Sequence, residues 1–260
     1  MTEGMSDLTL AIVFAVFGLL VGSFLNVCIY RLPRRESLMW PGSHCTRCDR
    51  SLAWFENVPV LSWMVLRGRC RTCGEGISAV YPLVEIVTAS IFAGGYLVYG
   101  LTPLLAVRLL FACAMIVLFM IDLRHRILPN AITVPGIVAG LVFSAILPPG
   151  WLASLIGVIV GGGLLFVIAE GYYRLRGIEG LGMGDVKMLA MIGAFLGWQL
   201  TLVTLVLASF SGSIVGVGLI AAGRGGMQAA LPFGTFLAIG ALVAAVSGDA
   251  ILAWYISLYP

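Results

Sequence analysis

Pro103-Leu-Leu-Ala-Val-Arg-Leu-Leu-Phe-Ala-Cys-Ala-Met-Ile-Val-Leu-Phe-Met-Ile121 is a stretch of membrane-spanning length that contains one charged side chain, Arg108. A helix needs about 20 mostly apolar residues to cross the hydrocarbon core of a bilayer. A backbone in contact with lipid must also satisfy its own hydrogen bonds, which favours helices. We therefore predict an all-α polytopic membrane protein with about eight transmembrane helices, at residues 8–30, 80–99, 103–121, 128–147, 151–173, 186–198, 199–222 and 233–256.

The composition of the whole chain supports this class. Of its 260 residues, 60% are hydrophobic and only 10% are charged, and the mean hydropathy is +1.06. The net charge of +3 is too small to predict nucleic-acid binding. Glu3 and Asp7, rather than basic residues, flank the first apolar run, so we expect that run to remain as a membrane anchor and not to be a cleaved signal peptide.

The distribution of basic residues predicts the orientation in the membrane. Lys and Arg are enriched in cytoplasmic loops. If the N-terminus lies outside and the chain crosses eight times, the inside segments hold 14 of the 15 basic residues. They are Arg31, Arg34, Arg35, Arg47, Arg50, Arg67, Arg69, Arg71, Arg124, Arg126, Arg174, Arg176, Lys187 and Arg224. We predict both termini outside and one large cytoplasmic loop, residues 31–79.

That loop carries four of the six cysteines, as Cys45-Thr-Arg-Cys48 and Cys70-Arg-Thr-Cys73. Two C-x-x-C units in one loop supply four thiolates for a tetrahedral zinc ion, which would be structural because no ligand position stays open. A reducing cytoplasm argues against disulfides. The alternative is a set of free or redox-active thiols.

Two aspartates lie at the edges of apolar runs. Asp122 directly follows the run 103–121, and Asp185 precedes the run 186–198 within Gly182-Met-Gly-Asp185. In the predicted topology both carboxylates lie at the cytoplasmic boundary of the membrane. A charge costs ~2.5–3.5 kcal/mol at the centre of a membrane helix, so such residues usually have a function. Two close carboxylates could share one proton for acid–base hydrolysis, whereas each alone could be an interfacial charge.

The chain resembles the bacterial prepilin peptidases, which are membrane aspartyl proteases with a Gly-x-Gly-Asp motif. Order and spacing agree from about residue 20 to residue 240, with Thr46-Arg47 and Asn130 as small departures where family members often have Pro and Asp. The matching stretches are the two C-x-x-C units, Gly22-Ser-Phe-Leu-Asn-Val27, Tyr30-Arg-Leu-Pro33, Glu56-Asn-Val-Pro-Val-Leu-Ser-Trp63, Arg67-Gly-Arg-Cys70, Tyr81-Pro-Leu-Val-Glu85, Ile121-Asp-Leu123, Leu128-Pro129, Gly182-Met-Gly-Asp-Val-Lys187, Gly193-Ala-Phe-Leu-Gly-Trp198 and Leu231-Pro-Phe-Gly-Thr-Phe-Leu237.

This resemblance implies a peptidase that removes the short basic leader from type IV prepilins or pseudopilins, on the cytoplasmic side of the bacterial inner membrane. Asp122 and Asp185 occupy the positions of the two catalytic aspartates. The implied organisation is a first transmembrane helix at 1–30, a zinc-loop domain at 31–79 and a peptidase domain at 80–260.

Seven further residues are expected to support the substrate or the active site. Glycines let a backbone come close to an extended substrate, and cations could hold anionic substrate groups. The Pro-containing motif before the last run is expected to border the site. These residues are Gly182, Gly184, Lys187, Arg124, Arg126, Pro232 and Gly234.

The resemblance also implies N-methylation of the new N-terminal residue, with S-adenosylmethionine as methyl donor. No glycine-rich nucleotide motif is visible in the sequence, so this activity rests on the resemblance alone. Glu56 and Trp63 are the candidates for the cofactor pocket, and the alternative for the aromatic residues of the loop is an interfacial belt or the core of the zinc loop.

Two other classes of function use the same features. An ion-coupled transporter also carries membrane carboxylates, but transporters tend to have inverted repeats and broken helices at mid-membrane. We find no internal repeat, and both aspartates lie at a predicted interface. A zinc-loop scaffold without catalysis would tolerate the loss of either carboxylate.

Overall fold

The structure is a computed structural model that describes residues 6–177, 181–223 and 231–258. In these ranges the chain is helical and has no strand, apart from two isolated bridges in the loop, His44 with Ser51 and Arg69 with Gly76. The all-α prediction is confirmed. The chain divides into two compact units, residues 1–117 and 118–260, which are described separately below.

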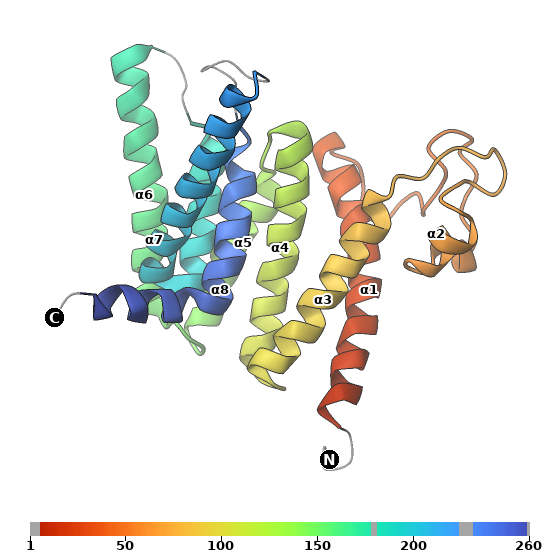
Figure 1. Cartoon of the computed structure of the whole chain (residues 1–260), viewed down its shortest axis with the longest axis horizontal. Coiled ribbons are helices and arrows are strands. Elements are labelled where there is room, and N and C mark those ends of the chain that lie inside the picture. Colours follow the sequence, from red (N-terminus) through yellow and green to blue (C-terminus); the bar gives the residue numbers. More distant parts are fainter. Residues whose placement is uncertain (1–5, 178–180, 224–230, 259–260) are drawn as a thin grey trace. The chain divides into compact units, whose positions relative to one another are not determined.

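The first unit holds two long helices, the cysteine-containing loop and most of a third long helix (Figure 1). Ser6 caps the first helix, since its hydroxyl accepts the Thr9 N–H at 3.3 Å. In chain order the elements are α1 (Asp7–Arg31), η1 (Leu32–Arg34), η2 (Trp54–Asn57), α2 (Leu61–Val65), α3 (Val80–Tyr99) and α4 (Pro103–His125), which continues into the second unit.

Small residues allow α1 and α3 to pack closely. A Cβ atom placed on Gly18 would lie 2.7 Å from the Ala89 Cα, and one on Gly22 would lie 2.7 Å from the Glu85 Cα. Helix backbones in membranes approach one another at such positions. The glycines of the first apolar run therefore have a packing role.

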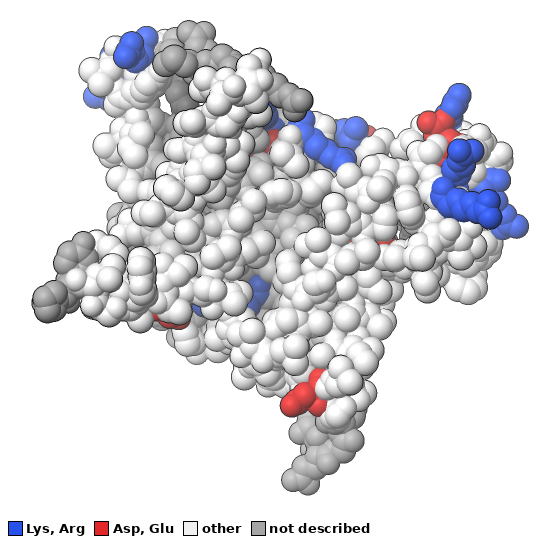
Figure 2. Space-filling view, viewed as in Figure 1, with Lys and Arg blue, Asp and Glu red and all other residues white. Residues whose placement is uncertain are grey.

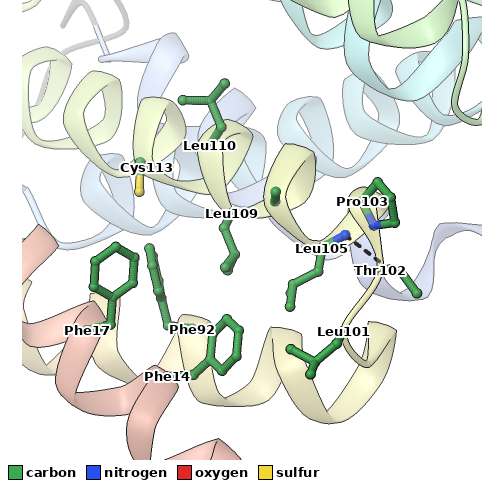
Figure 3. A pocket seen from close by; sticks show the side chains of 11 residues that line it. Phe14, Phe17, Phe92, Leu101, Thr102, Pro103, Leu105, Leu109, Leu110 and Cys113 are labelled. Carbon is green, nitrogen blue, oxygen red and sulfur yellow. Dashed lines mark hydrogen bonds between the residues drawn. The ribbon is translucent and has the colours of Figure 1, made fainter. Parts of the chain in front are cut away.

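An apolar cavity of about 620 Å³ lies between α1, α3 and α4 in this unit. Figure 3 shows the rings of Phe14, Phe17 and Phe92 on one side of it and Leu105 and Leu109 on the other. Next to it, Phe14 stacks on Tyr96 with the ring centroids 5.2 Å apart. The lining has almost no polar atoms, so the cavity offers packing surface and no groups for acid–base chemistry.

The second unit contains the end of α4 and four further helices. Prolines or glycines precede or begin several of them, as expected at helix starts. The helices are α5 (Asn130–Ser144), α6 (Trp151–Arg176), α7 (Met183–Ala221) and α8 (Phe233–Ser257). In this unit α7 packs against α5, α6 and α8.

The helix α7 is broken at Gly197, which has φ 76° and ψ 169°. These angles are unfavourable for any residue with a Cβ atom. The two predicted runs 186–198 and 199–222 are the two halves of α7, on either side of this residue. The predicted boundary is thus one or two residues late.

The second half of α7 runs back toward the start of α8. Gly248, near the end of α8, lies against Leu200, whereas Gly212 lies against Phe236 in the first turn of α8. The first half runs antiparallel to α6, since Gly157 lies against Gly193 and Gly161 lies against Leu189. Gly161 also lies against Thr201, whereas Gly197 lies against Ala153, so the chain returns along α6 after the break and the two halves of α7 run in opposite directions.

Six of the described helices are long and apolar enough to cross a membrane, namely α1, α3, α4, α6, α7 and α8. The seventh apolar helix, α5, is shorter, at 15 residues. Figure 2 shows that the visible helical surface is almost entirely uncharged. The chain is a multi-pass membrane protein, and the total of eight crossings stays a prediction.

Candidate functional site

Asp122 lies in the last turn of α4 and is 5% exposed. The backbone N–H of Thr235 donates to Asp122 Oδ2 at 2.7 Å, and the Thr235 hydroxyl donates to the same oxygen at 3.0 Å. Thr235 belongs to the first turn of α8, where free N–H groups and the helix dipole favour an anion. The start of α8 is thus a binding site for the Asp122 carboxylate.

Gly234 permits this close approach of α8. A Cβ atom at this position would lie 3.0 Å from Asp122 Oδ2 and 2.9 Å from the Leu128 side chain. Leu128 also contacts Gly184, where an added Cβ would lie 3.0 Å from the Leu128 Cβ. Leu128 therefore contacts both the start of α8, which binds Asp122, and the start of α7, which carries Asp185.

Asp185 is the third residue of α7, and it is partly buried. Its carboxylate reaches back to the backbone of Gly182, the N-cap residue. An acidic side chain at this position commonly caps a helix in this way. The glycines around Asp185 thus shape the start of α7 and let its carboxylate fold back toward Gly182.

The structure brings the two predicted aspartates together in the second unit. Leu128 lies against Gly184, next to Asp185, and against Gly234, next to the Asp122 carboxylate, although 62 residues separate the two aspartates in the sequence. Unlike charges stabilise each other at this range, whereas two carboxylates favour a state with a single shared proton. Two carboxylates in one region of the second unit could therefore supply one proton donor and one proton acceptor.

The predicted cations have different surroundings. Lys187 donates from Nζ to Asn130 Oδ1 at 3.0 Å and so links the starts of α7 and α5. Arg126 exerts its charge on Asp122, and its N–H donates to the Asp122 carbonyl at 2.8 Å. Arg124 is exposed. Pro232 is the N-cap residue of α8.

The four cysteines of the loop form one cluster in the first unit. The Sγ atoms of Cys45, Cys48, Cys70 and Cys73 all lie within 4.8 Å of one another, and those of Cys45 and Cys73 are 3.7 Å apart. In a tetrahedral site with Zn–S bonds of about 2.3 Å, neighbouring sulfurs are about 3.8 Å apart. The cluster therefore fits a zinc ion.

The two C-x-x-C units have the same backbone pattern. The N–H of Cys45 donates to the Arg50 carbonyl at 3.0 Å, and the N–H of Cys70 donates to the Glu75 carbonyl at 2.7 Å. Backbone N–H groups of Cys73 and Thr72 lower the pKa of Cys70 to about 6. Such bonds stabilise the thiolate, the form that binds a metal.

The two candidates for the cofactor pocket have partners inside the loop. Glu56 is buried, and it accepts from Arg50 at 2.7 Å and from the Ala53 N–H at 2.8 Å. Arg50 is the main cause that holds the pKa of Glu56 below its usual value. Trp63 donates from Nε1 to the Ile77 carbonyl at 3.0 Å.

Comparison with known proteins identifies the relatives of the chain. Residues 16–99 match the model of the bacterial peptidase A24 N-terminal domain, and residues 109–217 match that of the type IV leader peptidase family. A prepilin leader peptidase/N-methyltransferase of Aeromonas salmonicida is 38% identical over 99% of this chain and 97% of its own length. The chain belongs to the type IV leader peptidase family.

Two other family members carry the same name. The protein of Myxococcus xanthus is 43% identical over 83% of this chain and 65% of its own length. That of Pseudomonas putida is 38% identical over 92% of this chain and 91% of its own length. No solved structure matches the chain. The resemblance drawn from the sequence motifs is thus confirmed at the level of the family.

Sequence reasoning missed Thr235, the residue that holds Asp122. The motif Leu231-Pro-Phe-Gly-Thr235 was expected to border the site through Pro232 and Gly234. The position of Thr235 three residues after Pro232 indicates the first turn of a helix, where its backbone N–H is free to bind an acceptor and its hydroxyl lies nearby. Which carboxylate they meet is decided by tertiary packing.

Proposed function

We propose that the chain is a membrane aspartyl endopeptidase that removes the leader from type IV prepilins or pseudopilins, with Asp122 and Asp185 as its catalytic residues. The observation that carries this proposal is that Leu128 lies against both the start of α7, which holds Asp185, and the start of α8, which binds the Asp122 carboxylate. Membership of the type IV leader peptidase family supports it.

The proposed chemistry assigns different roles to the two aspartates. Asp122 Oδ2 accepts two hydrogen bonds from Thr235, which favours the ionised form of this carboxylate. Asp122 then takes a proton from water through Oδ1 as the water oxygen bonds to the scissile carbonyl carbon. Asp185 carries the shared proton and donates it to the carbonyl oxygen of the tetrahedral species.

Collapse of this species completes the hydrolysis. The C–N bond breaks as the amide nitrogen takes up the proton that Asp122 received, and Asp185 recovers its own proton from the diol. The leader leaves with a new carboxyl group, and the mature chain leaves with a free amine.

The names of the relatives support a second activity, N-methylation of this amine. S-adenosylmethionine would supply the methyl group as an electrophilic sulfonium. The side chains of Glu56 and Trp63 are occupied within the loop, so we assign no step of methyl transfer to them.

The remaining parts of the proposal concern location and metal. We infer a bacterial inner membrane protein with both termini outside and the loop 31–79 in the cytoplasm, where prepilin leaders are accessible. A zinc ion held by Cys45, Cys48, Cys70 and Cys73 would stabilise this loop. The division into 1–30, 31–79 and 80–260 also stays part of the proposal.

The experiment measures product masses after the purified protein is incubated with a prepilin peptide, with and without S-adenosylmethionine. We expect leader loss in both reactions and an added methyl group only with the cofactor. Asp122→Asn and Asp185→Asn should each slow cleavage by about 10²–10⁴-fold, because general acid–base catalysis is lost. Both should still methylate a peptide that already has the mature N-terminus.

Asp249→Asn is the matched control, because Asp249 is exposed and lies far along α8 from Thr235. It should cleave at the normal rate. Normal cleavage by either active-site variant would disprove the proposal. The transporter alternative has no support from the relatives, which are all named as peptidases.

A further inference from the structure

The short helix α2 (Leu61–Val65) has one side that is covered and one side that is not. Trp63 faces the second cysteine unit, since its indole bonds to Ile77 and lies against Gly68. The opposite stripe is apolar and open. Its members Leu61, Met64 and Val65 are 62%, 62% and 80% exposed.

A hydrogen bond determines the depth at which α2 lies. The N–H of Val60, the residue before α2, donates to Glu85 Oε2 at 2.7 Å. Glu85 is buried and lies five residues inside α3, a membrane-spanning helix that begins at Val80. Five residues of helix correspond to about 7.5 Å along its axis. An α3 helix that enters the bilayer at its first residue would therefore place the start of α2 level with the headgroup side of the cytoplasmic leaflet.

The chain turns sharply to hold this position. Val60 has φ 61° and ψ −52°, and the Leu61 N–H donates to the Pro59 carbonyl at 2.6 Å, which defines a γ-turn. This turn is rare, and a β-branched residue is unfavourable in it. Such a conformation persists only where the surrounding structure holds it. The placement of α2 is thus determined by the fold.

Aromatic and basic side chains border the same surface. Phe55, Leu61 and Val65 line a groove of about 500 Å³ with Arg71 beside it, and the Arg71 guanidinium lies 5.6 Å from the centre of the Phe55 ring. Arg67 and Arg69 are also exposed. Apolar anchors with adjacent arginines are typical of segments that lie in the interface of an anionic membrane.

We propose that α2 is a membrane-docking element, in which Leu61, Met64 and Val65 enter the bilayer and Arg67, Arg69 and Arg71 contact anionic lipid headgroups. Interfacial helices bury their apolar face by about 5–10 Å, and the hydrogen bond from Val60 to Glu85 ties the start of α2 to the first turns of the membrane-spanning helix α3. Docking of α2 would then fix the distance between the cysteine-containing loop and the membrane surface. This inference does not depend on the proposed peptidase activity.

Photo-crosslinking of the full-length protein in lipid nanodiscs tests the proposal. A diazirine amino acid replaces Val65, or Met64 on the same stripe, and Thr46 is the matched control because it is exposed in the first cysteine unit. The discs contain phosphatidylcholine with a minority of phosphatidylglycerol. We expect several-fold more lipid adducts at positions 64 and 65 than at 46, measured by mass spectrometry on variants with normal thermal melting.

The lipid composition of the adducts tests whether the arginines contact anionic headgroups. Phosphatidylglycerol should exceed its share in the disc, by roughly fivefold for each arginine in full contact. The excess should fall in the double variant Arg67→Gln/Arg71→Gln. It should remain in Arg47→Gln, because Arg47 is paired with Glu75.

Three results would overturn the proposal. The first is a lipid yield at positions 64 and 65 no higher than at 46. The second is crosslinking of these positions to another copy of the chain. The third is displacement of lipid by an added prepilin peptide, which would make the stripe a substrate-binding surface.

Discussion

At the residue scale, the best-defined interaction of the site is that of Thr235 with Asp122. Two donors from one residue meet a single carboxylate oxygen. A hydrogen bond to a charged group contributes about 1.5–3 kcal/mol. We therefore regard Thr235 as a positioning residue, which acts by holding Asp122 and has no contact with substrate assigned to it.

Thr235→Val removes the hydroxyl donor and keeps the backbone donor and the shape. We expect the rate of leader cleavage to fall by about 10–100-fold, which corresponds to the loss of one charged hydrogen bond. The acidic limb of the rate profile should move to higher pH, since the ionised form of Asp122 loses a donor. Asp185 and Arg126, the other charged groups acting at this position, are unchanged.

Thr235→Ser is the conservative control, because it keeps the hydroxyl. Its pH profile should match that of the wild type. If Thr235→Val cleaves more slowly but keeps the wild-type profile, Thr235 has only a structural role.

Gly234→Ala tests the close approach of α8 to Asp122. The new methyl group would lie 3.0 Å from Asp122 Oδ2 and 2.9 Å from Leu128, so the Asp122 carboxylate, the Leu128 side chain or α8 has to shift, which disturbs the two hydrogen bonds from Thr235. We expect at least a tenfold loss of cleavage, about 1.4 kcal/mol or more in the activation barrier. Gly218→Ala, which meets no atom within 4 Å, should be active; equal rates for the two variants would contradict this account.

At the element scale, α7 changes direction because of one residue. Gly197 has a positive φ, and an added Cβ would lie 3.1 Å from Pro149. This break lets 183–196 and 198–221 run in opposite directions within one stretch of helix. It thereby places both Asp185 and the partner surface of α8 at one end of the second unit.

Gly197→Ala should lower stability by about 1–3 kcal/mol, the usual cost of a strained backbone conformation. Thermal melting in detergent, followed by tryptophan fluorescence, would measure the change. Gly163→Ala is the matched control, because Gly163 is helical and its Cβ would meet open space. Equal melting of the two variants would contradict a special role for Gly197.

The cysteine cluster is the second element whose stability can be tested. Cys70→Ser should release zinc and lower the melting temperature of the loop, because a structural zinc site contributes directly to folding. Metal analysis and limited proteolysis of residues 31–79 would measure both effects. Cys113→Ser, outside the cluster, should retain the metal, and metal-free wild-type protein that resists proteolysis equally well would argue against a zinc-stabilised loop.

At the scale of the whole molecule, the basic residues predict the orientation. Of the 15 basic residues, 14 lie on one side in the predicted topology, and the positive-inside rule places that side in the cytoplasm. The described helices carry few charges outside their ends (Figure 2). The unequal distribution of basic residues therefore provides the main information about which side of the membrane each loop lies on.

Reporter fusions test this orientation. Alkaline phosphatase, which is active outside the cytoplasm, should be active when fused after Pro260 and inactive when inserted after Thr46. A cytoplasmic fluorescent protein should give the reverse pattern. Activity of the phosphatase at position 46 would place the cysteine loop outside and would contradict the proposed site of cleavage.

The sequence by itself determined the membrane class, the helical fold, the cysteine cluster and the two candidate aspartates. Each of these follows from local properties, namely apolar length, the C-x-x-C spacing and the rarity of charges near apolar runs. Only the tertiary structure decided that Thr235 holds Asp122 and that α7 breaks at Gly197. It also decided that the buried Glu85 carboxylate accepts a hydrogen bond from the Val60 N–H. These contacts join residues 25 to 113 positions apart or depend on a backbone angle, and helical periodicity carries no information about either.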